Sequence, residues 1–225
     1  MYCVKNAQVH HERKADLITS RSSHGCTVNV HKNEIYVAGG YHNGELTRSC
    51  EAYSVATNSW RQLPPLNEPK CSVTLCTLNG RYLYCFGGLT KQESGAFLLA
   101  SIEVLDLESP QPKWLMLSIK MPHQVCDIGA IPLSETEMLL YGGWNKSPIQ
   151  TAFIIRQNSI KGLNGAPHLT HEFAQVAAQM DKCDFSLISG VAMKTGEPEV
   201  IKVCCHSFLF AFNLKAKAFV GSSSM

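Results

Sequence analysis

Apolar, strand-like runs that stop on two glycines recur three times along the chain. They read EIYVAGG (34–40), RYLYCFGG (81–88) and EMLLYGG (137–143). A further apolar run precedes each of them, and polar turn residues separate the runs, which is the pattern of short antiparallel strands. A supersecondary unit that recurs in this way predicts a repeat protein, because one unit alone cannot bury its apolar faces.

The later half of each unit contains two bulky residues on either side of a turn. In the first unit Tyr53 precedes Trp60 by seven residues. The corresponding pairs predicted for the later units are Leu105 with Trp114, Phe153 with Ile160, and Phe212 with Phe219. A fainter version, Tyr2 with Val9, stands at the start of the chain. The first residues of successive pairs lie roughly 50 residues apart, which leaves room for four strands in each unit.

Proline-rich and polar stretches divide the chain into units. LPPLNEPK (63–70) is a connection, because its prolines prevent strand pairing. PHLTHEFAQVAAQMDK (167–182) has a helix-prone composition and predicts an insertion. The predicted organisation is the second half of a preceding unit at 1–22, complete units at 23–66, 67–120 and 121–166, the insertion at 167–182, and a degenerate fourth unit with a tail at 183–225.

This pattern resembles the kelch repeat. The first unit has all the residues typical of a kelch repeat, namely Gly39-Gly40, Tyr53 and Trp60. The later units keep parts of it: Gly87-Gly88 with Trp114, then Gly142-Gly143 with Phe153, and finally Phe212 without the glycines. The resemblance implies an all-β, kelch-type β-propeller, with about four four-stranded blades plus a partial N-terminal blade. Propellers have about four to eight complete blades. The partial N-terminal blade here has no first and second strands, and the C-terminal unit cannot supply them, so we expect an incomplete ring that belongs to a larger protein.

Composition narrows the classes of partner. The 225 residues are 45% hydrophobic and 17% charged, with a net charge of +2 and no Lys/Arg run, so neither nucleic acid nor a membrane is expected as a partner. The ten cysteines include no CxxC pair, and the start of the chain does not resemble a signal peptide. These features predict reduced thiols in a cytoplasmic protein, with no metal site and no cofactor.

The resemblance also implies a function, because kelch propellers mostly bind other proteins through loops at one end. The loop directly after the double glycine is a frequent source of contacts. The residues here that match it are Tyr41, His42 and Asn43 in the first unit, Lys91 in the second, and Trp144, Asn145 and Lys146 in the third. Aromatic and amide side chains of this kind suit an interface, so the predicted partner is another protein.

Two other classes remain open. Some kelch-like propellers are enzymes of the oxidase or sugar isomerase type, and a copper oxidase would need convergent Tyr, His and Cys ligands. The close histidine pairs, His10-His11 and His168 with His171, fall in a terminal connection and in the predicted insertion. No hydrolase, zinc-protease or phosphate-binding motif occurs, so no catalytic residue is assigned. A structural role within a larger assembly is the third possibility.

Overall fold

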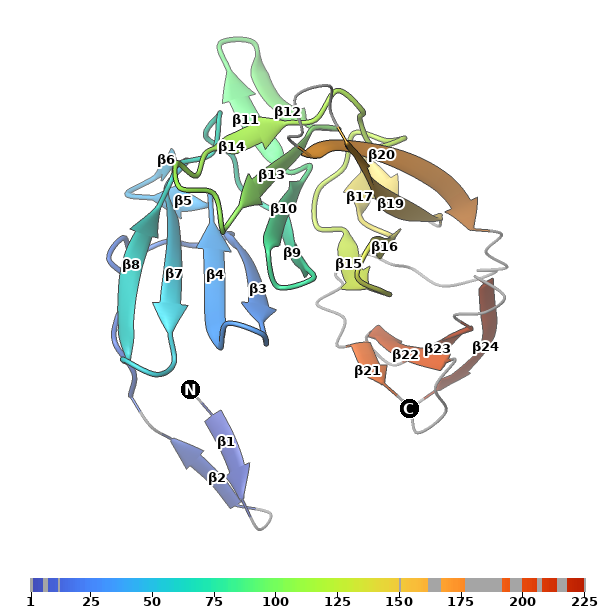
Figure 1. Cartoon of the computed structure of the whole chain (residues 1–225), viewed down its shortest axis with the longest axis horizontal. Coiled ribbons are helices and arrows are strands. Elements are labelled where there is room, and N and C mark those ends of the chain that lie inside the picture. The colour runs from blue at the N-terminus through green and yellow to red at the C-terminus, as the bar shows by residue number, and fades with distance from the viewer. Residues whose placement is uncertain are drawn as a thin grey trace.

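In the computed structural model all regular structure in the described residues is β-strand, with no helix among them. The structure describes residues 2–5, 8–11, 13–149, 151–161, 167–176, 192–194, 200–205, 208–213 and 218–224. Four antiparallel four-stranded sheets follow one another along the chain and form an open arc rather than a closed ring (Figure 1). These sheets are blades of a kelch-type β-propeller, and we number them blade 1 to blade 4.

Each blade takes its strands in chain order. Blade 1 contains β3 (Gly25–Asn29), β4 (Glu34–Ala38), β7 (Cys50–Ser54) and β8 (Ser59–Leu63). Blade 2 contains β9 (Thr74–Leu78), β10 (Tyr82–Phe86), β13 (Ile102–Asp106) and β14 (Trp114–Met116). Neighbouring strands pair in this order in both blades.

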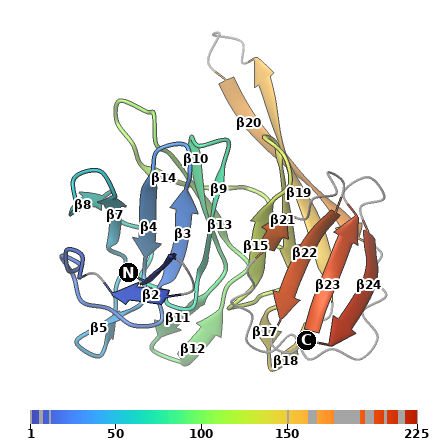
Figure 2. The ribbon, with the colours of Figure 1, turned by 90° about the horizontal axis from the view of Figure 1, so that it is seen from below.

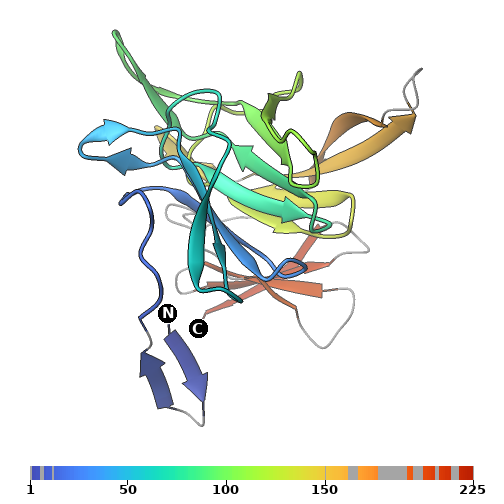
Figure 3. The same ribbon diagram turned by 60° about the vertical axis from the view of Figure 1, so that its left-hand side comes forward.

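The same order holds in the second half of the chain. Blade 3 contains β15 (Gly129–Pro132), β16 (Glu137–Tyr141), β19 (Ala152–Lys161) and β20 (Pro167–Val176). Blade 4 contains β21 (Ala192–Lys194), β22 (Val200–Cys205), β23 (Phe208–Asn213) and β24 (Ala218–Ser224). A separate hairpin, β1 (Tyr2–Lys5) with β2 (Gln8–His11), precedes blade 1 and extends away from it (Figure 3).

Blades 1, 2 and 3 pack face to face, and the alternation of side chains along β10 supplies an interface on each side of blade 2. In β10, Leu83 and Cys85 belong to a buried cluster shared with blade 1. Tyr82, Tyr84 and Phe86 belong to a cluster shared with blade 3. Because successive side chains of a strand point to opposite faces, blade 2 has a core on each side. This explains why all five residues of β10 are buried.

Blade 3 corrects two predictions made from the sequence. Residues 167–176 of the predicted insertion form β20, so this part is a strand and not a helix; residues 177–182 lie outside the described residues. Pairing with β19 and packing of Phe173 on the core below it outweigh the local helix propensity. Residues 152–161 form one unbroken strand, so Phe153 and Ile160 are not a pair across a turn.

The strand register identifies the true counterparts in blade 3. Tyr53 lies opposite Ile35 and Trp60, and the equivalent position in β19 is Ile155, which lies opposite Met138 and Phe173. Phe153 is therefore two residues out of register with Tyr53. In blade 4 the predicted pair is seen, since Phe212 and Phe219 lie opposite each other.

The two tryptophans of the repeat differ in burial. Trp114 is 4% exposed, and its indole N–H donates to the Pro64 carbonyl at 2.9 Å. Trp60 is half-buried, with its ring 5.2 Å from that of Tyr53 and its N–H on the Ala15 carbonyl at 2.9 Å. Trp114 lies in the core between blades 1 and 2, whereas Trp60 lies on the opposite face of blade 1.

Candidate protein-interaction surface

Three short hairpins follow the three double glycines. They are β5 (Tyr41–His42) with β6 (Glu45–Leu46), β11 (Leu89–Gln92) with β12 (Gly95–Leu98), and β17 (Trp144–Asn145) with β18 (Ser147–Pro148). Figure 2 shows all three along the lower edge of the molecule. We call them together the hairpin surface.

The double glycines place these hairpins. Gly39 and Gly40 have φ values of 67° and 99°, which side chains rarely adopt. A Cβ on Gly39 would lie 2.3 Å from the Lys70 carbonyl oxygen, and that oxygen accepts a 2.8 Å hydrogen bond from the Gly40 N–H. The chain entering blade 2 thus passes directly against the end of β4. Side chains at these positions would push the next blade away and displace the hairpin.

Backbone contacts attach each hairpin to the start of its own blade. Isolated bridges join Ser22 with Tyr41, Cys71 with Leu89, and Cys126 with Trp144. The residue after each of these bridges hydrogen-bonds to its equivalent in the neighbouring blade. The Ser72 N–H donates to the Ser23 carbonyl at 2.8 Å, and the Asp127 N–H donates to the Ser72 carbonyl at 3.1 Å. The hairpins therefore rest on a hydrogen-bonded frame that repeats from one blade to the next.

The predicted contact residues all lie on this surface. Tyr41 and Trp144 are 36% and 41% exposed, which is unusual for large aromatic side chains. The remaining predicted residues are exposed (Asn43, Lys91, Lys146) or half-buried (His42, Asn145). Sequence reasoning missed Phe97, which is 40% exposed on β12. An aromatic residue within the longer loop after Gly88 was the signal that could have revealed it.

His42 is held by its own blade. Its Nδ1 lies 2.8 Å from the Ser20 carbonyl, and its Nε2 lies 3.2 Å from Nδ2 of Asn43. Asn43 has a φ of 50° at the tip of the hairpin, a conformation that asparagine tolerates better than most residues. The tip of β5–β6 therefore has a defined shape before any partner binds.

Buried ion pairs support the first two hairpins from below. In blade 1, Arg21 lies 2.5 Å from Glu51, and it also donates to the carbonyls of Gly39 and Ser49 at 2.9 and 2.8 Å. In blade 2, Lys70 lies 2.5 Å from Glu103, and both side chains are fully buried. Burial lowers the pKa of Lys70, but the neighbouring Cys85 and the Glu103 carboxylate more than offset this, and the net shift is upward. Lys70 is thus held charged, and both ion pairs lie beside the double glycines.

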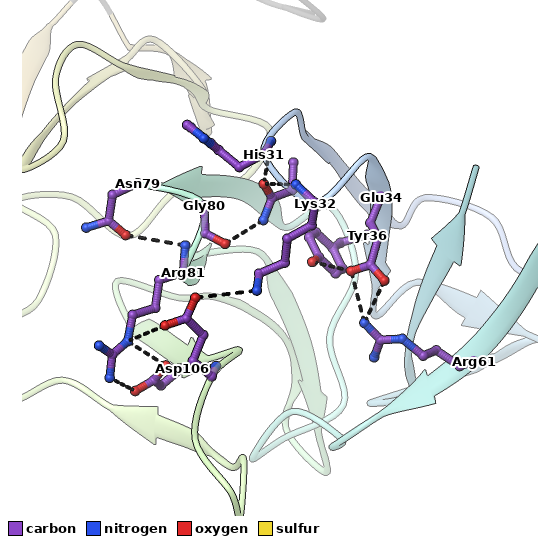
Figure 4. Close-up of polar contacts among 11 residues, drawn as sticks. His31, Lys32, Glu34, Tyr36, Arg61, Asn79, Gly80, Arg81 and Asp106 are labelled. Atoms are coloured by element: carbon purple, nitrogen blue, oxygen red, sulfur yellow. Dashed lines mark hydrogen bonds and ion pairs between the residues drawn. The ribbon is translucent and has the colours of Figure 1, made fainter. Parts of the chain in front are cut away.

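The opposite end of blades 1 and 2 is also charged, but its groups are paired (Figure 4). Arg81 donates to both carboxylate oxygens of Asp106 at 2.9 and 2.7 Å, and these hydrogen bonds lower the pKa of Asp106. Arg61 binds Glu34 at 2.9 Å. Asn29 donates to the Gly80 carbonyl at 2.8 Å across the two blades. We assign these contacts to stability, because their charges already have partners.

Candidate chemistry elsewhere is sparse. Within the described ranges no group of three His, Cys, Asp or Glu side chains is placed to hold a metal ion. Burial raises the pKa of the Cys76 and Cys85 thiols to about 12, so neither is a reactive thiolate near neutral pH. Of the predicted close histidine pairs, His171 is buried beside Tyr84, and the side chains of His10, His11 and His168 lie outside the described ones. No helix of the described residues is long and apolar enough to cross a membrane.

Comparison with known proteins agrees with the architecture. Residues 22–67 match the family described as Kelch motif. Kelch-like protein 40 of Xenopus tropicalis is 33% identical over 121 residues, which cover 50% of this chain and 19% of that protein. Kelch repeat and BTB domain-containing protein 1 of Ectromelia virus (strain Moscow) is 31% identical over 125 residues, covering 53% and 21%. Beta-scruin of Limulus polyphemus is 34% identical over 84 residues, covering 37% and 9%.

The repeated blades, their double glycines and these similarities agree. The chain carries a kelch motif at residues 22–67, and it is similar to kelch-repeat proteins over about half of its length. It spans about a fifth of the length of the first of the curated relatives that it matches.

Proposed function

We propose that this chain is a protein-interaction module that binds another protein through the hairpin surface. The observation that carries the proposal is the placement of Tyr41, Phe97 and Trp144, three exposed aromatic side chains on three successive hairpins at one end of the blades. Exposed aromatic groups on rigid supports contribute large contact areas at low entropic cost. Lys91 and Lys146 add a polar, positively charged rim.

The similarity to Kelch-like proteins supports an interaction role over the enzyme alternative. We further propose that the chain acts as one part of a larger cytoplasmic protein. The partner's identity is left to experiment, and we assign neither a cofactor nor a catalytic residue.

The test compares variants of the parent protein in quantitative affinity purification from cells. The triple variant Tyr41→Ala, Lys91→Ala, Trp144→Ala removes contact groups from all three hairpins. The control variant Leu115→Ala, Met116→Ala removes side chains that are 49% and 47% exposed on β14, outside the hairpin surface. We expect a co-purifying protein to be lost with the triple variant and kept with the control. Equal recovery with both variants would refute the hairpin surface as the contact site.

A further inference from the structure

The face of blade 1 that points away from blade 2 is only partly covered. Blade 1 stands at one end of the arc of blades (Figure 1). On this face Val28 is 54% exposed, Cys26 is exposed and Ile35 is half-buried. Apolar side chains that are exposed together on one sheet face mark a contact surface. We call this surface the open face of blade 1.

Equivalent residues of the next two blades are buried. In strand register Ile35 corresponds to Leu83 of blade 2 and to Met138 of blade 3, and Cys26 corresponds to Leu75. Leu83 and Met138 are 0% exposed, and Leu75 is 4% exposed. Leu75 and Leu83 belong to the cluster shared with blade 1, and Met138 belongs to the cluster shared with blade 2. In blades 2 and 3 this face is therefore buried by the blade that precedes it.

One segment of the chain crosses the outer part of the open face. It comprises residues 15–21, and we call it the entry segment. The Trp60 N–H donates to its Ala15 carbonyl at 2.9 Å, and its Ile18 N–H donates to the Glu51 carboxylate at 2.8 Å. The entry segment is thus fixed to blade 1 by its backbone.

The entry segment repeats the connection between blades 1 and 2, which is residues 64–70. There the Trp114 N–H donates to the Pro64 carbonyl at 2.9 Å, and the Asn67 N–H donates to the Glu103 carboxylate at 3.0 Å. This connection leads from β8, the outermost strand of one blade, into the next blade. The strand that leads into the entry segment is β2, so β2 holds the place of β8 and its partner β1 holds the place of β7.

The hydrogen-bonded frame beneath the hairpins also continues toward the open face. The Asp127 N–H donates to the Ser72 carbonyl and the Ser72 N–H to the Ser23 carbonyl, but the Ser23 N–H has no acceptor within the described residues. The next residue is His24, whose Nδ1 atom is buried and also lacks a partner there. Its equivalent in blade 2, Val73, packs on blade 1. Unpaired buried nitrogens are rare, so a neighbour is expected on this side.

We propose that the open face of blade 1 is the interface for one further blade of the parent protein. In this blade β1 and β2 are the outer strands, and polypeptide outside these 225 residues supplies the two inner strands. A blade fits this surface because the face, the entry segment and the frame each repeat the interface between blades 1 and 2. The inference rests on the proposed larger protein, and it names the surface through which the rest of that protein is joined.

The inner strands are the part to test, because they lie outside this chain. Val28 is on β3, the innermost strand of blade 1. Its equivalent in blade 2 is Thr77, whose hydroxyl donates to the Val28 carbonyl at 3.0 Å. Position 77 thus contacts the innermost strand of the preceding blade, and position 28 should do the same.

The test measures access to position 28 in the purified parent protein. Val28→Cys and Leu115→Cys are each made in a Cys26→Ser background and labelled with N-ethylmaleimide, and peptide mass spectrometry follows each introduced thiol. The two native side chains are similarly exposed in this structure, at 54% and 49%. We expect position 28 to react about tenfold or more slowly than position 115, because a covered thiol reacts only through local opening. In urea the two should react at equal rates.

The occupant is decided by two further outcomes. Equal labelling of both positions in the folded parent would overturn the inference, because the face would then be free. Protection of position 28 that is lost on dilution would assign the face to a second copy of the protein, and this would overturn it as well. Protection that is independent of concentration would support a blade of the same polypeptide.

A second measurement does not depend on labelling. Val28→Asp places a charge where a blade packs, so it should lower the unfolding temperature of the parent by about 5–10 °C, whereas Leu115→Asp should leave it nearly unchanged. The same unfolding temperature for both variants would contradict the interface.

These experiments fail independently of the proposed contact site. Loss of the partner with the hairpin variants, together with rapid labelling at position 28, would remove the blade interface and leave the hairpin surface in place. Protection of position 28 without any effect of the hairpin variants on the partner would do the reverse.

Discussion

Replacing Trp114 by alanine should destabilise the chain far more than the same change at Trp60. The two residues are equivalent, opposite Leu105 and Tyr53, but Trp114 is 4% exposed between two blades and Trp60 is half-buried. Burial of about 150–250 Å² for a tryptophan, at about 25 cal/mol per Å², corresponds to roughly 4–6 kcal/mol. Large-to-small core substitutions of this kind cost about 3–5 kcal/mol. The change also leaves the Pro64 carbonyl without its 2.9 Å hydrogen bond.

We therefore expect Trp114→Ala to lower the free energy of unfolding by about 4 kcal/mol, and Trp60→Ala to lower it by about 1–2 kcal/mol. Urea unfolding followed by circular dichroism would measure both values, with Leu115→Ala on the exposed face of the same strand as a near-neutral control. Equal losses for the two tryptophans would refute the packing of blade 2 on blade 1 described above.

Three further changes have defined outcomes. Gly87→Ala places a Cβ 2.2 Å from a carbonyl oxygen at the start of the next blade, whereas the Cβ of Gly44→Ala meets nothing within 4 Å. Of these two variants, only Gly87→Ala should prevent folding, and the yield of folded protein would measure the difference. Burial lowers the pKa of His171 from 6.5 to about 4, so the unfolded chain binds a proton at this residue before the folded chain does. The free energy of unfolding should therefore fall by at most about 3 kcal/mol as the pH decreases from 6.5 to 4. Denaturation measured across this pH range would test this, and His171→Gln should abolish the dependence. Glu103→Gln leaves the Lys70 ammonium buried without its carboxylate and should cost about 3–5 kcal/mol in chemical denaturation, most of which a second change, Lys70→Met, should recover.

The parts of the fold that the sequence revealed are those carried by local residue patterns. Double glycines mark strand ends because their backbone geometry excludes other residues, and alternating apolar runs mark strands that are buried on both faces. The blades, their order and the exposed loops after the double glycines follow from these signals, whereas the folding of these loops into hairpins does not. The tryptophan pattern gave the position of Trp60 but not its burial, which depends on what packs against that face of blade 1.

Features that depend on pairing between distant segments could not be predicted. Phe153 and Ile160 reproduced the seven-residue spacing by chance within one strand, and only the register with β16 shows that Ile155 is the counterpart of Tyr53. The composition of 167–176 favours a helix, yet these residues form β20 because they pair with the open edge of β19. The Lys70–Glu103 pair is equally invisible in the sequence, because the two residues are far apart along the chain.

Site-specific photo-cross-linking in the parent protein tests the central claim most directly. A photoreactive phenylalanine analogue would replace Trp144 on the third hairpin or, as the control, Met116 on β14, both of which are exposed. The account predicts that the analogue at position 144 cross-links to a partner protein and that the analogue at position 116 does not. Cross-linking from position 116 and none from position 144 would contradict it.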